Sequence, residues 1–115
     1  MKAMVAAATV ALVAAGCASD SKPHRGHLSI WPEVEVFTPC GSTDPLWLDY
    51  NTKTREPIAK EHWALQKKPY GTTFAVMEGE VGPQLDCGFC QGYKGSFKVS
   101  RVLEQRIPHP NDCTS

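Results

Sequence analysis

Four of the five cysteines, Cys40, Cys87, Cys90 and Cys113, constrain the fold of this chain more than any other feature. In an oxidising compartment an even number of cysteines in a small domain indicates disulfides, and four cysteines can pair in three ways. Closing a loop of about 74 residues would stabilise the folded state by roughly 4 kcal/mol, whereas a loop of about four residues would contribute only about 2 kcal/mol. The spacing therefore favours a structural Cys40–Cys113 bridge and a local Cys87–Cys90 bridge, with cross-pairing left open.

The fifth cysteine, Cys17, follows a segment typical of exported proteins. Lys2 precedes an uncharged run, residues 3–15, which is shorter than the about 20 apolar residues that span a bilayer as a helix and so indicates an export signal. Residues 14–17 (AAGC) resemble the lipobox of bacterial lipoproteins, whose cysteine is lipidated and begins the mature protein. We predict a signal peptide at 1–16 and a lipid on Cys17; a secretory signal cut near Ala18 is the alternative. By lipoprotein convention, Ala18 after the cysteine implies the outer membrane.

Residues 18–27 (ASDSKPHRGH) are small and polar and contain both Pro and Gly, so we predict a flexible tether at 17–27. His24 and His27 could gather a metal ion with Asp20, but we expect these side chains to be solvated. Residues 28–115 are enough for one domain. With 12 basic and 12 acidic side chains, the chain lacks the basic surface that nucleic acids require, so no nucleic-acid partner is expected.

Short strands dominate the predicted domain. Alternating residues at 34–38 and an apolar run at 45–50 predict two strands with a polar turn at 51–54 after them, and further strands are expected at 74–81 and around 97–102. The alternation slips near Arg101, which indicates a β-bulge. The tail from Ile107 onward, with two prolines, is expected to be an irregular segment that returns to end near Cys113.

One helix interrupts the strands. Residues 58–68 change to helical spacing, which places an apolar set on one face: Ile58, Ala59, His62, Trp63 and Leu65. Pro57 suits the first turn of a helix and Pro69 its end. The predicted fold is mainly β: a small, strongly bent antiparallel sheet or barrel with one covering α-helix, stabilised by disulfides.

The order of several short motifs resembles the C-terminal domain of the NlpE envelope-stress lipoproteins. The matching segments are 37–40 (FTPC), the helix, 74–79 (FAVMEG), 97–99 (FKV) and the ending 110–113 (PNDC), over roughly residues 34–115. The resemblance implies an OB-like barrel in which Cys40 and Cys113 form a disulfide that reports on periplasmic oxidation. This chain differs from the NlpE family in two respects. Its tether runs directly into this domain, and Cys87 and Cys90 occupy a loop where the family has a plain linker.

Cys87-x-x-Cys90 is the sharpest chemical motif. Two thiols at this spacing can exchange with other thiols or ligate Cu(I). A thioredoxin-like enzyme would need the motif to open a helix in a βαβ unit, and no such pattern is present. A structural zinc site would need a second pair, which is absent once Cys40 and Cys113 are joined. We expect an inert disulfide that staples a loop.

The remaining candidate side chains have structural interpretations. His62 is expected to be a hydrogen-bonded packing residue and His109 to be exposed. We expect Trp31 to anchor the start of the domain by packing, with a partner contact as the alternative. Core positions are expected for three further side chains: Trp47, Trp63 and Met77.

No nucleophile-elbow context surrounds any Ser, so no hydrolase is indicated. We expect a monomeric, lipid-anchored, non-enzymatic protein of the outer membrane, facing the periplasm. It would act as a redox-responsive binding or sensing module toward an envelope protein partner. The alternatives are a lipoprotein that binds Cu(I) through Cys87 and Cys90, and a purely structural lipoprotein; no other cofactor is expected.

Overall fold

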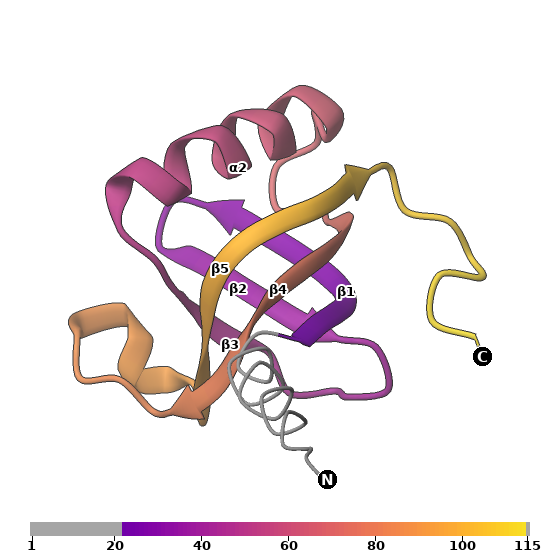
Figure 1. Ribbon diagram of the computed structural model, residues 1–115. Helices are drawn as coiled ribbons and strands as arrows, with labels where there is room; N and C mark the ends of the chain where they lie inside the picture. Colours follow the sequence, from indigo (N-terminus) through magenta and orange to yellow (C-terminus); the bar gives the residue numbers. More distant parts are fainter. Residues whose placement is uncertain (1–21, 115) are drawn as a thin grey trace, which may run out of the picture.

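The computed structural model describes residues 22–114, and in it five strands close into a barrel that one helix covers (Figure 1). The elements are β1 (Lys22–Trp31), β2 (Val34–Pro39), β3 (Leu46–Asp49), α2 (Thr52–Leu65), β4 (Thr73–Pro83), the short 3-10 helix η2 (Gly88–Gly92) and β5 (Gly95–Arg106). Around the barrel the strands follow the order β1-β2-β3-β5-β4, and β4 pairs back with β1. Among the paired strands of residues 22–114, only β3 and β5 run parallel to each other. The predicted OB-like barrel with one covering helix and disulfides is confirmed.

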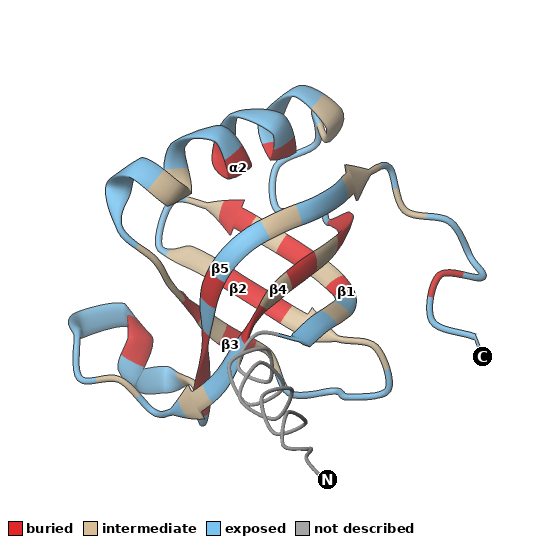
Figure 2. Cartoon of the chain, viewed as in Figure 1, coloured by how far each residue is buried: buried red, intermediate tan, exposed pale blue. Residues whose placement is uncertain are grey.

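Buried residues alternate along the strands with more exposed neighbours (Figure 2). The side chains of the buried hydrophobic residues pack together as the core of the barrel. Leu28 and Ile30 point inward from β1, and the rings of Phe37 and Phe97 meet across the interior at 4.9 Å between centroids. Met77 is fully buried among them, as predicted. The hydrophobic pattern of the strands therefore specifies which face of each is inside.

Strand β1 begins earlier than the sequence suggested. Residues 22–27, predicted as part of a flexible tether, pair with β4, and Gly26 and His27 pair with β2 as well. The reason is that Gly26 is itself an inward-facing residue: a Cβ there would lie 2.3 Å from the Thr38 carbonyl oxygen and 2.8 Å from the Phe37 ring. The buried alternation Gly26, Leu28, Ile30 thus starts with a residue that carries no side chain.

Helix α2 also begins earlier than predicted. The Asn51 side chain caps it by accepting a hydrogen bond from the Thr54 amide at 2.8 Å, so the expected polar turn at 51–54 is the start of the helix. Pro57 lies inside the helix rather than in its first turn, and the helix ends at Leu65. Ile58, Ala59 and His62 form the buried face.

The slip predicted near Arg101 is present where β5 pairs with β4. Val76 pairs with Glu104 while Met77 pairs with Val102, and a second shift lies between Glu78 and Gly79. Each shift adds a residue to β5 opposite β4. Such bulges increase local bending, which helps a five-stranded sheet to close.

We expect Gly79→Ala to destabilise the protein by about 1–3 kcal/mol, because overpacking forces backbone shifts. A Cβ at Gly79 would lie 2.2 Å from the Lys98 carbonyl oxygen and 2.9 Å from the Phe97 ring. Urea denaturation measures the change, with Gly88→Ala as the control because no atom lies within 4 Å of a Cβ there. Equal midpoints for the two variants would show that β4 and β5 can separate at no cost.

Candidate functional site

The Cys40–Cys113 disulfide joins the end of β2 to the C-terminal tail across a sequence separation of 73. Cys40 directly follows β2, and its amide donates a hydrogen bond to the Arg25 carbonyl oxygen at 2.8 Å. Cys113 is exposed, whereas Cys40 is half-buried. The tail leaves β5 and turns back beside the barrel (Figure 1). The pairing predicted from loop length is therefore present, and one of its two sulfurs belongs to a solvent-exposed residue.

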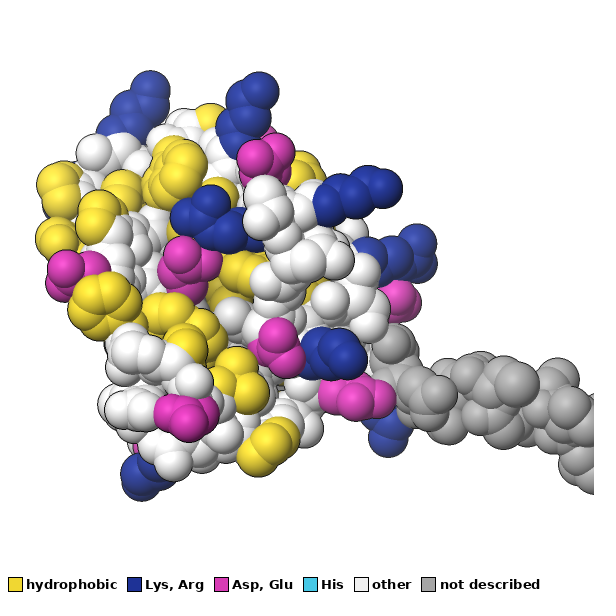
Figure 3. Space-filling view, turned by 90° about the vertical axis from the view of Figure 1, so that its left-hand side faces the viewer, with side chains coloured by type: hydrophobic (Ala, Val, Ile, Leu, Met, Phe, Trp, Pro, Cys, Tyr) yellow, Lys and Arg dark blue, Asp and Glu magenta, His cyan; other side chains and the backbone are white. Residues whose placement is uncertain are grey.

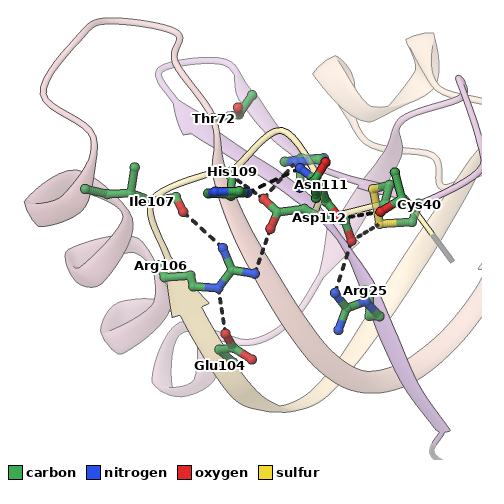
Figure 4. A network of polar contacts seen from close by, with 12 residues as sticks. Arg25, Cys40, Thr72, Glu104, Arg106, Ile107, His109, Asn111 and Asp112 are labelled. Carbon is green, nitrogen blue, oxygen red and sulfur yellow. Dashed lines mark hydrogen bonds and ion pairs between the residues drawn. A yellow bond between two sulfur atoms is a disulfide. The ribbon is translucent and has the colours of Figure 1, made fainter.

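Asp112, next to Cys113, fastens the tail to the barrel (Figure 4). Asp112 is only 4% exposed although Asn111 and Cys113 on either side are exposed. The carboxylate accepts hydrogen bonds from Arg106 Nη2 at 2.7 Å and from the His109 amide at 2.6 Å. Arg25 Nη2 donates to the main-chain oxygen of Asp112 at 3.0 Å. The tail is thus held by a disulfide and by a charged network on adjacent residues.

The charges of this network reinforce one another. Burial alone would raise the pKa of Asp112, but the His109 amide and the Arg106 guanidinium outweigh it and hold the pKa below its ordinary value. The hydrogen bond to Asp112, together with one to Glu104, raises the pKa of Arg106. Asp112 is therefore ionised at neutral pH, and its negative charge lies beside the guanidinium group of Arg106.

A second polar cluster lies where α2 covers the barrel. His62 is fully buried; its Nε2 accepts the Ile30 amide at 3.4 Å and its Nδ1 lies 2.8 Å from Thr73 Oγ1. Because Nε2 accepts, Nδ1 carries the proton. Burial lowers the pKa of His62 to about 4. The predicted hydrogen-bonded packing role of His62 is confirmed, and the side chain joins α2 to β1 and β4.

The structure supports the predicted position of one tryptophan and contradicts the predicted positions of two others. Trp31 packs its ring against His62 at 5.1 Å and donates its indole N–H to the Gly71 carbonyl, which supports the predicted anchoring role. Trp63 is 44% exposed and Trp47 is only half-buried, so their predicted core positions are wrong. Trp63 lies at the edge of the buried helix face and donates to the Ile30 carbonyl at 2.6 Å. Trp47 alternates with the inward-facing leucines of β3 and packs outside the barrel against Tyr93.

The predicted histidine positions also differ from the structure in part. His24 and His27 are not solvated tether residues but half-buried members of β1. Their rings lie edge-on to Phe97 and Phe74, at 5.0 and 5.8 Å between centroids. His109 is exposed, as predicted.

Cys87 and Cys90 form the second disulfide, in the β4–β5 connection. Cys87 directly precedes η2, so the motif does open one short 3-10 turn, and Cys90 is fully buried there. Phe89 between them is exposed. A cysteine binds Cu(I) as a thiolate, and in this state the sulfurs of Cys87 and Cys90 are bonded to each other. Among residues 22–114, no group of three His, Cys, Asp or Glu side chains is arranged to hold a metal ion.

A groove of about 450 Å³ lies between α2 and β5. Pro57, Ile58 and Val102 give it an apolar lining, and Lys53 and Arg101 lie at its edge. Arg101 is bound to Glu78 at 2.8 Å, which neutralises one of these charges. On the face turned to the viewer in Figure 3, Lys and Arg side chains are scattered among acidic and hydrophobic ones rather than joined into a basic stripe.

Sequence reasoning singled out both disulfide pairs but missed Arg25, Arg106 and Asp112. These residues come from β1, β5 and the tail, and the Arg25–Asp112 hydrogen bond joins positions 87 residues apart. The available signal was the Asp directly before Cys113. An acid beside a bridging cysteine is held near the other end of the bridge, where the Cys40 amide binds the Arg25 carbonyl oxygen.

Comparison of the chain with protein-family models, with curated proteins and with solved structures returns no match. The resemblance to NlpE C-terminal domains therefore stays a prediction. Cys17, the predicted lipidation site, lies outside the described residues. Within residues 22–114, no helix combines the length and apolar character needed to cross a bilayer.

Proposed function

We propose that this chain is a lipid-anchored, non-enzymatic protein of the bacterial cell envelope whose barrel responds to thiol redox state through Cys40 and Cys113. The lipobox-like segment at 14–17 supports the anchor. The observation that carries the proposal is that Cys113 is exposed while the preceding residue in the chain, Asp112, is buried against the barrel. Breaking one accessible covalent bond would release a segment that is docked on the barrel.

The response would be an ordinary thiol–disulfide exchange with a dithiol protein as reductant. A thiolate of the donor attacks the sulfur of Cys113, an exposed residue, which forms a mixed disulfide and releases Cys40 as a thiolate that takes up a proton. The second thiolate of the donor then attacks the donor's own sulfur in the mixed disulfide and releases Cys113 as a thiolate, which also takes up a proton. The donor leaves as a disulfide, so two electrons and two protons have passed to the protein.

The other disulfide would not share this role. Cys90 is buried within η2, and the short loop that its bridge closes contributes little loop entropy. Reduction there would leave β4 and β5 paired on either side of the connection. Cys87–Cys90 therefore serves as an internal control for any effect of reductant on the tail.

Mass spectrometry of protein from the membrane fraction tests both parts of the proposal. We expect an acyl-modified N-terminal peptide that begins at Cys17. The reduction potential of Cys40–Cys113 is measured by equilibration in glutathione buffers followed by thiol alkylation. We expect a value above about −300 mV, because disulfides with potentials below this value resist reduction by the glutathione pool.

An unmodified Cys17 would contradict the anchor. A Cys40–Cys113 potential below about −300 mV would make the bond purely structural, and the protein would then be a structural lipoprotein. Equal opening of both disulfides with the tail still docked would contradict the assignment of the response to Cys40 and Cys113.

A further inference from the structure

We propose that Arg25, Arg106 and His27 form a carboxylate-binding site that Asp112 fills in the oxidised protein. When reduction releases the tail, the same site would take an aspartate-bearing segment of a partner protein. This inference rests on the proposed redox response, because the tail must leave before another segment can bind.

The site encloses a single residue. Arg106 Nη2 binds the carboxylate of Asp112 at 2.7 Å, and His27 Nε2 lies 3.9 Å from its second oxygen. Arg25 binds the main-chain oxygen of the same residue at 3.0 Å. The three side chains therefore recognise both a carboxylate and the peptide carbonyl attached to it, which a simple anion cannot offer.

The barrel, not the tail, positions these cations. Arg25 lies on β1 and Arg106 on β5, and both strands pair with β4 between them. Their guanidinium groups lie 5.0 and 4.3 Å from the ring centroid of Phe74, a fully buried residue of β4. Contacts of this kind hold a guanidinium plane over an aromatic face. The site would therefore keep its shape when Asp112 leaves.

One acidic residue would remain beside the vacated site. Glu104 binds Arg106 Nε at 2.7 Å, and its side chain is 46% exposed. It uses a different edge of the guanidinium from Asp112, which binds Nη2. With Asp112 gone, two arginines and His27 would face one carboxylate, so a net positive charge would be left unpaired.

The tail itself indicates what kind of peptide fits. The Asp112 carboxylate also accepts the His109 amide at 2.6 Å, and the Asp112 amide donates to the His109 carbonyl at 3.1 Å. The bound segment is thus a tight turn in which the aspartate caps an amide three residues before it. A partner segment would need an aspartate at the end of such a turn.

A labelled peptide with the sequence of residues 107–114, carrying serine in place of Cys113, is the probe. The full chain carrying Cys40→Ser, Cys113→Ser and Asp112→Asn should bind it, because its own tail can no longer fill the site. We expect fluorescence anisotropy to show at least tenfold weaker binding, roughly the loss of one charged hydrogen bond, when the peptide aspartate is replaced by asparagine or when Arg106→Gln is added.

Arg101→Gln is the matched control, because Arg101 also lies on β5 but pairs with Glu78; it should leave peptide binding unchanged. Oxidised wild-type protein should not bind the peptide. No binding up to about 1 mM, equal binding after Arg106→Gln, or displacement by inorganic phosphate at the concentration of the peptide would overturn the proposal.

The two proposals can fail separately. A tail that stays docked in reduced wild-type protein would contradict the redox response even if the triple variant binds the peptide. A tail that is released without any peptide binding to the triple variant would contradict only the carboxylate site.

Discussion

Cys113→Ser is expected to lower the melting temperature of the oxidised protein by about 20 °C, the largest stability effect of any single substitution proposed for this chain. The disulfide closes a sequence separation of 73. In the chain-entropy model its loss costs about 4 kcal/mol, because the unfolded chain regains the freedom of that loop. A domain of this size shifts its melting temperature by about 4–8 °C for each kcal/mol. Differential scanning calorimetry measures the shift.

The paired replacement Cys87→Ser with Cys90→Ser is the control for Cys113→Ser. It removes a disulfide of sequence separation 3, so the same model gives a loss of only about 2 kcal/mol. We expect Cys113→Ser to cause the larger shift. An unchanged transition for Cys113→Ser would mean that the tail contributes nothing to the stability of the barrel.

Acidification from pH 6.5 to about pH 4 is expected to remove as much as about 3 kcal/mol of stability through His62 alone. Burial lowers the pKa of His62 to about 4 in the folded protein, so in this window the unfolded chain binds a proton that the folded protein does not. The stability is present in full above pH 6.5 and is lost as the pH falls. A protonated Nε2 could no longer accept the Ile30 amide. Urea titrations across this pH range measure the loss.

His62→Gln should flatten this pH profile, because the side chain no longer titrates, while lowering stability at neutral pH. His109→Gln, at an exposed position of the tail, should keep the slope of the wild type. Asp112 contributes to folding stability in a different pH range. Its pKa lies below the ordinary value of 3.8, so the stability that it contributes is lost only at lower pH. A wild-type slope that survives His62→Gln would contradict the assignment.

The barrel could be predicted from the sequence because its strands carry their pattern in ordinary apolar residues. Leu46 and Leu48 alternate in β3, and the slip near Arg101 marks a real bulge. The first half of β1 was missed because Gly26 occupies an inward position, where a glycine is indistinguishable from a loop residue. The start of α2 was missed because Asn51 suits a turn as well as a helix cap.

The disulfide of the candidate site could be predicted from the sequence, but the polar contacts around it could not. Loop length favoured the Cys40–Cys113 bridge, but no local pattern connects Arg25 with Arg106. They become neighbours only because β4 pairs with both of their strands. The irregular tail carries no periodicity, so the burial of Asp112 follows from the tertiary structure alone. Long-range polar contacts of this kind depend on strand order, which the sequence pattern does not encode.

Amide hydrogen exchange in the tail bears most directly on the claim that Cys40–Cys113 holds this segment on the barrel. The amides of His109, Asp112 and Thr114 are hydrogen-bonded within the tail. In a Cys87→Ser, Cys90→Ser background, reduction should speed their exchange at least about tenfold while the amides of β1 and β4 stay protected. Equal protection of the tail in the oxidised and reduced protein would contradict the claim.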